Sequence, residues 1–163
     1  MEERLVCDWD HRDEAEVLVR DGWKWHLSCE KHVPNFSPNY SVPISRSVLI
    51  AEARRNARQI LEELRAGKIV KIVNDSPAYR GWEFYRVLVN SENGPRICDI
   101  GYCVSAKRFI SPLYFVPERA FDSFVKLYLN EWRFEFLDGS VSDEEQLRQF
   151  VRNLHREVRS DAV

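Results

Sequence analysis

Residues 7–32 read CDWDHRDEAEVLVRDGWKWHLSCEKH, and the expected fold of the N-terminal part follows from them. The stretch opens with one pair of metal-ligand side chains, Cys7 and His11, and closes with a second pair, Cys29 and His32. Seventeen residues separate the two pairs. Thiolate and imidazole are common ligands of Zn2+ in proteins. The pattern Cys-x3-His followed by Cys-x2-His therefore predicts a four-ligand zinc site.

The segment between the two pairs has the pattern of a β-hairpin. Asp21-Gly22 is a dipeptide typical of tight two-residue turns. On either side of it, residues 14–20 and 23–29 alternate apolar and polar side chains, as half-buried strands do. Such a hairpin places the second ligand pair at the exit of one strand and the first pair just before the other, so we expect the four side chains to meet.

A bound metal would also explain how so short a segment folds. The first 33 residues cannot bury enough apolar surface to offset the loss of chain entropy. A structural zinc supplies roughly 10 kcal/mol or more in zinc-finger peptides. A site whose four positions are all filled by protein stabilises a fold and leaves no position for catalysis. The alternative interpretation is a set of unrelated thiols and imidazoles.

Residues 5–33 resemble the small zinc-ribbon and zinc-knuckle modules of bacterial and phage proteins. The resemblance rests on the two ligand pairs that flank the hairpin, and it covers about a fifth of the chain. The segment departs from four-cysteine ribbons at His11 and His32, and from the common finger because it has no helix between the pairs. The resemblance implies one structural Zn2+ held by Cys7, His11, Cys29 and His32.

The remainder of the chain predicts a larger second domain. Residues 34–43 contain three prolines among Asn and Ser, which is typical of an extended linker. After it, the apolar periodicity switches between helix and strand spacing. The predicted elements are a helix at 45–66, strands at 68–73, 82–89 and 96–104, a helix at 117–129, a strand at 132–137 and a helix from 142.

These elements define an α+β fold. With a short strand at 5–8, the predicted order is βββ, a linker, and then α-βββ-α-β-α. Strands joined by hairpins, with helices between them, favour a mainly antiparallel sheet. We therefore expect a zinc-stapled β-hairpin module at 1–33, a Pro-rich linker at 34–43 and an α+β domain at 44–163.

The composition is that of a folded protein, with 44% hydrophobic and 31% charged residues. No apolar run approaches the roughly 18 residues that a membrane span requires. The first residues, MEER, lack the apolar region of a signal peptide. We expect a cytoplasmic protein without a membrane anchor, in which the cysteines stay reduced.

The charge distribution bears on nucleic-acid binding. The chain has a net charge of −2, and residues 1–43 hold five Lys or Arg against nine Asp or Glu. Phosphate contacts need cations, so the expected zinc module does not look like a phosphate-binding finger. The last predicted helix carries an i, i+4 ladder of arginines, which is a candidate nucleic-acid stripe: Arg148, Arg152, Arg156 and Arg159.

That ladder has a simpler interpretation as a solvated helix face. Residues 143–145 are acidic and the arginines follow them, which is the polarity that the helix dipole favours.

Catalytic patterns are missing from the sequence, which has no Gly-rich phosphate loop, nucleophile elbow or His-Glu-x-x-His. Asp75, Glu83 and Asp99 lie in or beside predicted strands, but Lys71 is the single candidate lysine for a nuclease site with them, and its spacing matches no nuclease pattern.

One loop is rich in the residues that dominate protein interfaces. Tyr79, Arg80 and Trp82 lie together between two predicted strands. The leading hypothesis is therefore a non-enzymatic regulator, inhibitor or adaptor that binds a protein partner. The alternatives are a nucleic-acid-binding regulator that uses the arginine ladder, and an unrecognised metal-dependent enzyme. The oligomeric state has no signature in the sequence.

Overall fold

The computed structural model describes residues 3–110 and 112–161 of the chain. The chain divides into two compact units, and each unit is built from two separate segments. Unit 1 comprises Met1–Leu61 and Glu118–Trp132, and unit 2 comprises Glu62–Pro117 and Arg133–Val163. Residues 34–43, predicted to be a linker, lie within unit 1.

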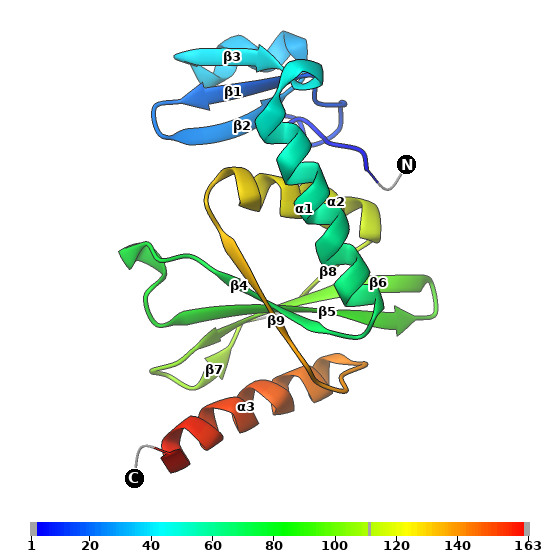
Figure 1. Cartoon of the computed structure of the whole chain (residues 1–163), viewed down its shortest axis with the longest axis vertical. Helices are drawn as coiled ribbons and strands as arrows, with labels where there is room; N and C mark the ends of the chain where they lie inside the picture. The colour runs from blue at the N-terminus through cyan, green and yellow to red at the C-terminus, as the bar shows by residue number, and fades with distance from the viewer. Residues whose placement is uncertain (1–2, 111, 162–163) are drawn as a thin grey trace. The chain divides into compact units, whose positions relative to one another are not determined.

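Unit 1 contains a three-stranded antiparallel sheet with the order β2-β1-β3 (Figure 1). The predicted hairpin is present, and Gly22 takes a left-handed conformation in its turn with φ 60°. Tyr40–Pro43, which lie in the expected linker, form the third strand and pair with the first. The strands are β1 Val17–Asp21, β2 Lys24–Ser28 and β3 Tyr40–Pro43.

The segments around this sheet are short. A strand was expected at 5–8, but Val6 forms only an isolated bridge with Glu14. After β2 the chain enters the 3-10 helix η1, Glu30–Phe36, and after β3 the 3-10 helix η2, Ile44–Arg46. The ligand residues expected from the sequence therefore lie in an N-terminal loop and at the start of η1.

Two amphipathic helices contribute to unit 1. Helix α1, Val48–Arg65, buries the stripe expected from its 3.6-residue period, and Gly67 ends it with φ 92°. Helix α2, Pro117–Leu129, begins with proline at its first position, as predicted. Its buried residues are Ala120, Phe121, Asp122, Phe124, Val125 and Leu129.

Unit 2 is built on an antiparallel sheet with the order β7-β6-β5-β4-β9, and β8 also pairs with β6. The long hairpin of β5 and β6 forms its centre, with Trp82 opposite Cys103 and Ser91 opposite Gly94. The strands are β4 Ile69–Val73, β5 Trp82–Ser91, β6 Gly94–Cys103, β7 Arg108–Phe109, β8 Leu113–Phe115 and β9 Arg133–Leu137.

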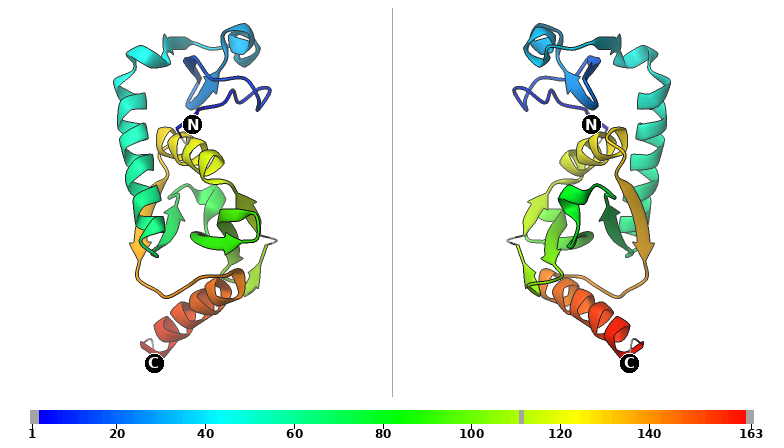
Figure 2. Two further views of the ribbon diagram at one scale, coloured as in Figure 1. Left: turned by 90° about the vertical axis from the view of Figure 1, so that its right-hand side faces the viewer. Right: turned by 90° about the vertical axis from the view of Figure 1, so that its left-hand side faces the viewer.

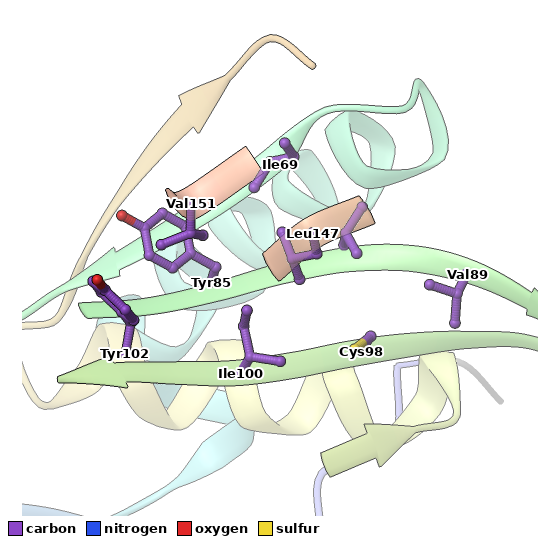
Figure 3. Close-up of a cluster of buried hydrophobic side chains, with 9 residues drawn as sticks. Ile69, Tyr85, Val89, Cys98, Ile100, Tyr102, Leu147 and Val151 are labelled. Atoms are coloured by element: carbon purple, nitrogen blue, oxygen red, sulfur yellow. The ribbon is translucent and has the colours of Figure 1, made fainter. Parts of the chain in front are cut away.

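Helix α3, Glu144–Asp161, packs on one face of the sheet of unit 2 (Figure 2). Its Leu147 and Val151 meet Tyr85 and Ile100 from the central hairpin, and all four side chains are fully buried (Figure 3). Successive strand residues point to opposite faces, so every second residue of β5 reaches this core. At roughly 25 cal/mol per Å2 of buried apolar surface, such clusters provide the main stabilisation of a domain.

Helix α3 begins at Glu144, two residues after the predicted start at 142. Asp143 is its capping residue, and its Oδ1 accepts a 2.8 Å hydrogen bond from the N–H of Gln146. The side chain of Gln146 in turn accepts the N–H of Ser142 at 2.9 Å. The acidic first turn of the helix agrees with the helix dipole.

The fold class is α+β, and the strand pairs of both sheets are antiparallel throughout the described ranges. A helix with the length and apolarity needed to cross a membrane does not occur among the described residues.

Candidate metal centre

Four side chains of unit 1 place one ligand atom each within 4.8 Å of all the others: Cys7, Asp10, Cys29 and His32. His32 Nδ1 lies 3.1 Å from Cys29 Sγ, 3.2 Å from Asp10 Oδ2 and 3.9 Å from Cys7 Sγ. Ligands bound to zinc at about 2.0–2.3 Å in a tetrahedron lie about 3.3–3.8 Å from one another. The four donors therefore have separations close to those of a metal-binding tetrahedron.

The two halves of the group come from two short loops. The N-terminal loop is closed by backbone hydrogen bonds from Cys7 N to Asp13 O and from His11 N to Cys7 O, both 2.8 Å long. The other half follows β2, where the N–H of His32 donates to the carbonyl of Cys29 at 3.2 Å. The hairpin of β1 and β2 joins the two loops and brings Cys7 and Asp10 close to Cys29 and His32.

Asp10 occupies the place expected for His11. The backbone of His11 has φ 57°, a left-handed conformation that is uncommon for a residue other than glycine, and its side chain is exposed. Asp10 Oδ1 accepts hydrogen bonds from the N–H groups of Arg12 at 2.8 Å and Asp13 at 2.9 Å. These bonds direct the other carboxylate oxygen toward His32. The donor set is thus two sulfurs, one nitrogen and one oxygen.

A signal for Asp10 was present in the sequence. Cys7 and Asp10 have the same spacing as Cys29 and His32, so the chain carries two Cys-x2-ligand pairs. The prediction considered only Cys and His as ligands, and it therefore placed the fourth ligand at the next residue, His11. Aspartate is a recognised zinc ligand at about 2.0–2.2 Å.

The loop backbone favours the ionised forms of two donors. Burial opposes ionisation of Cys7, but hydrogen bonds from backbone N–H groups, of which Cys29 contributes the strongest, lower the pKa of its thiol to about 7. The N–H groups of Arg12 and Asp13 hold the pKa of Asp10 far below its usual value. Burial raises the pKa of Cys29. A bound cation would favour the thiolate form of both cysteines.

Aromatic side chains border the group on the side of η1. Trp9 lies edge-on to Phe36 with ring centroids 5.7 Å apart, and its ring centroid is 6.3 Å from that of His32. Phe36 stacks on His26 of β2 at 4.8 Å. On the opposite strand, Val19 is fully buried. These contacts give the ligand loops an apolar support that hydrogen bonds alone would not provide.

A charged network connects the ligand loop to helix α2. Lys126 Nζ lies 2.7 Å from Asp8 Oδ1 and 2.8 Å from Asp122 Oδ2. The other oxygen of Asp122 accepts the N–H of Val6 at 3.0 Å, and Asp8 Oδ2 accepts the N–H of Leu27 at 2.8 Å. Burial raises the pKa of Asp122, and Lys126 opposes that rise. Helix α2 therefore supports the residues on both sides of Cys7.

Asn130, the residue after the end of helix α2, contacts the free edge of β2. Asn130 Oδ1 accepts the N–H of Trp25 at 3.0 Å, and Asn130 Nδ2 donates to the carbonyl of Trp25 at 3.2 Å. The amide side chain of Asn130 thus makes the two hydrogen bonds that a neighbouring strand would make to Trp25. The hairpin is held by α2 as well as by its own turn.

An acidic hollow of about 400 Å3 opens beside Cys29. Lys31 contributes one cation to its wall, and Nζ of this residue lies 3.5 Å from a carboxylate oxygen of Asp13. The remaining polar lining consists of carboxylates, which raise the local concentration of cations. The lining residues are Asp13, Glu14, Glu16, Cys29, Glu30 and Lys31.

The predicted interface loop lies in unit 2, between β4 and β5. Pro77–Tyr79 form the 3-10 helix η3, which is capped by the side chain of Ser76. Tyr79 and Trp82 are 38% and 39% exposed, and Arg80 is exposed as well. The structure thus leaves all three predicted interface side chains accessible at one end of the sheet.

The arginine ladder of α3 is engaged within unit 2. Arg148 lies 2.6 Å from Glu144, and Arg152 lies 3.5 Å from Glu145. The guanidinium groups of Arg148 and Arg152 also approach the ring of Phe109 at 5.7 Å and 5.3 Å. Arg156 is exposed on the same helix, and the side chain of Arg159 lies outside the described part.

A partly buried polar group beneath α3 was not anticipated from the sequence. Glu83 Oε1 accepts a 2.5 Å hydrogen bond from the hydroxyl of Tyr85 and lies 2.7 Å from His155 Nε2. Lys71 Nζ lies 3.7 Å from the other oxygen of Glu83. Burial opposes ionisation of Glu83, but these partners lower its pKa overall. The group joins α3 to β4 and β5.

No family model matches the chain, and neither the curated proteins nor the solved structures contain a significant match. The side chains of the candidate metal centre in unit 1 and of the β4–β5 loop in unit 2 are therefore the basis for a proposal of function.

Proposed function

We propose that this chain is a non-enzymatic binding protein whose unit 1 is held by a structural Zn2+ and which recognises a protein partner. Cys7, Asp10, Cys29 and His32 would hold the ion. The observation that carries this proposal is the set of four protein donors at separations close to those of a tetrahedron. When all four corners come from the protein, the metal contributes folding energy and has no open position for a substrate.

Asp10 supports a structural role in particular. Its Oδ1 is fixed by two backbone N–H groups, so the carboxylate is oriented before an ion arrives. A ligand held in this way resists displacement by water or by a substrate. The alternative of a metal-dependent enzyme requires such a displacement. Cysteine thiols that serve as ligands must stay reduced, and a reducing compartment keeps them so, which agrees with the proposed cytoplasmic location.

The protein-binding half of the proposal is supported by Tyr79, Arg80 and Trp82. Tyrosine, tryptophan and arginine are the residue types enriched at interface hot spots, and here they are exposed together. The nucleic-acid alternative receives less support, because Arg148 and Arg152 already contact Glu144, Glu145 and Phe109.

Cobalt substitution and metal analysis test the metal site. We expect one equivalent of zinc in protein purified without a metal-affinity column. We also expect the Co2+ form to have the intense visible bands of a four-coordinate site and thiolate charge-transfer bands. Weak visible bands typical of five or six ligands would indicate bound water and would favour the enzyme alternative.

Photo-crosslinking tests the partner-binding role. A photoreactive residue placed at Tyr79 or Trp82 of the full chain should capture the same protein in an extract of the source cells. The same residue placed at Glu52, an exposed position of α1, is the matched control. Failure of positions 79 and 82 to give a product absent from the control would contradict the proposal. A crosslinked product that contains nucleic acid, and that disappears on nuclease treatment, would support the alternative of a nucleic-acid-binding regulator.

A further inference from the structure

One end of the sheet of unit 2 combines exposed aromatic side chains with cations. Directly opposite residues share a face of a sheet, so Trp82, Cys103 and Arg108 form one row across β5, β6 and β7. The loop before β5 adjoins this row, because the N–H of Val104 donates to the carbonyl of Gly81 at 2.9 Å. We call this surface the aromatic–basic patch and define it by Tyr79, Arg80, Trp82, Lys107, Arg108 and Ile110.

Glycine at position 101 lets an aliphatic side chain join the patch. Gly101 lies opposite Phe84, and the N–H of Ile110 donates to the carbonyl of Gly101 at 3.0 Å. A Cβ atom on Gly101 would lie 2.6 Å from the end of the Ile110 side chain. Ile110 therefore lies over the sheet at the place where a larger residue would exclude it, and it remains 46% exposed.

The aromatic part of the patch is ordered by ring contacts. Trp82 and Phe84 lie on one face of β5 with their rings nearly parallel, at an interplanar angle of 14° and a centroid distance of 6.5 Å. Tyr79 meets Phe84 edge-on at 6.2 Å. Rings held in this way lose little conformational entropy when a partner covers them, which favours their use as anchors.

The cations of the patch lack acidic partners. Arg80, Lys107 and Arg108 are exposed, and none of them pairs with a carboxylate in the described part of the chain. By contrast, Arg133 of β9 is bound by both oxygens of Asp75 at 3.0 Å and 3.2 Å. Three uncompensated positive charges remain beside the exposed rings, on a chain whose net charge is −2.

We propose that the aromatic–basic patch binds an acidic protein segment that carries a bulky apolar side chain. This inference rests on the proposed protein-binding function and specifies the chemistry of the partner. Carboxylates of the segment would pair with Arg80, Lys107 and Arg108, while its apolar side chain covers Trp82 and Ile110. Opposite charge at the rim steers the encounter, and the desolvated aromatic centre supplies most of the affinity.

The occupant is a protein and not a nucleic acid for two reasons. Ile110 offers an aliphatic surface, whereas single-stranded nucleic acids bind to aromatic faces on which bases stack. In addition, the chain as a whole has a net charge of −2, which repels a long polyanion more than a short acidic segment.

Selection from a random dodecapeptide library displayed on phage, with the full-length chain as target, tests the inference. We expect enriched peptides to combine Asp or Glu with Trp, Phe or Leu. A labelled synthetic copy of an enriched peptide should bind at least about tenfold more weakly to R80E/K107E/R108E, which corresponds to about 1.4 kcal/mol. It should also slow alkylation of Cys103, which lies between Trp82 and Arg108.

The matched control reverses three exposed arginines of unit 1, and it makes the same change in net charge: R46E/R55E/R119E. It should bind the peptide as the unmodified chain does, and equal circular dichroism spectra would establish that both triple variants fold. Equal weakening by the control would overturn the inference, because general charge and not the patch would then govern binding.

Two other results also overturn it. Enriched peptides without acidic residues that still require Trp82 would refute the acidic partner but leave the protein-binding function intact. Binding of a labelled thymidine 20-mer that is lost in R80E/K107E/R108E, with no peptide enriched, would assign the patch to nucleic acid and would count against the proposed function as well.

Discussion

Asp10 Oδ2 lies 3.2 Å from His32 Nδ1, although these two residues are separated by the whole β1–β2 hairpin. The carboxylate reaches this position because the backbone of the next three residues turns and binds its other oxygen. The fourth corner of the candidate metal centre is therefore an oxygen, and the side chain of His11 is exposed beside it.

Alanine substitutions distinguish the role of Asp10 from that of His11. Asp10→Ala should lower zinc affinity by more than the roughly 10–100-fold that loss of an outer-shell partner costs, because it removes a direct ligand. His11→Ala, the matched control, should leave the affinity unchanged. Competition with a chromophoric chelator measures both values. A larger loss in His11→Ala than in Asp10→Ala would assign the site to the histidine.

Metal removal should affect unit 1 alone. We expect chelation to accelerate hydrogen exchange in β1, β2 and the supporting helix α2, because Lys126 and Asn130 bind the segments that carry the ligands. The central strands β5 and β6 should keep their protection, since their core is formed by α3 and the sheet. Mass spectrometry with and without chelator measures amide hydrogen exchange in both sets of elements. Equal acceleration of exchange in both sets would contradict the division into units.

Lys126→Ala should lower the free energy of unfolding by about 1–3 kcal/mol, because it leaves Asp8 and Asp122 without their shared cation. Lys24→Ala is the control: this lysine is exposed on β2 and makes no ion pair among the described residues, so its change should stay within about 0.5 kcal/mol. Urea denaturation measures both. Equal effects would show that the network is not required.

Asp99→Asn should destabilise unit 2 by about 3–5 kcal/mol. Arg86 and Asp99 are directly opposite on β5 and β6, with Nε and Oδ2 2.8 Å apart, and the side chain of Arg86 is 6% exposed. Asparagine keeps an oxygen at this position but no negative charge, so the buried guanidinium group of Arg86 loses the charge of Asp99. The double variant R86L/D99L removes both charges and should be less destabilised than D99N in thermal denaturation; the reverse order would argue against the pair.

The Glu83 group should make the stability of unit 2 depend on pH. The pKa of Glu83 is lower in the folded chain than its ordinary value of 4.5, because Tyr85, His155 and Lys71 favour the carboxylate. A lowered folded pKa gives stabilisation that is present above pH 4.5 and is lost as the pH falls through the folded pKa. The difference in unfolding free energy between the unmodified chain and Glu83→Gln should therefore shrink below pH 4.5.

Glu52→Gln provides the reference for that experiment, because Glu52 is exposed on α1. Its substitution should have the same small effect at every pH. A difference for Glu83→Gln that stays constant from neutral pH to pH 3 would exclude the proposed linkage.

Local sequence signals located most of the elements. Pro117 marked the start of α2, and Asp21-Gly22 marked the hairpin, because their backbone preferences act within a few residues. The short strands β3, β7 and β8 were not predicted. Each has four residues or fewer, which is too short for alternation to be recognised, and each depends on a partner strand for its hydrogen bonds.

Three of the four members of the metal group, Cys7, Cys29 and His32, could be found from spacing alone. The fourth depended on a backbone conformation, namely the turn at His11 that exposes its imidazole and leaves Asp10 facing inward. The assignment of α2 to unit 1 was also out of reach. It is decided by contacts across more than a hundred residues, such as those of Asp122 with Val6 and Asn130 with Trp25.

Because residues 118–132 complete unit 1, the hairpin leaves the ribosome long before its supporting helix exists. At roughly 5–20 residues per second, the hundred residues between His32 and Trp132 take about 5–20 s to translate. During that interval Cys7 and Cys29 would be part of a nascent chain in which unit 1 has not completed folding. An ion captured early would protect them from oxidation until the helix docks.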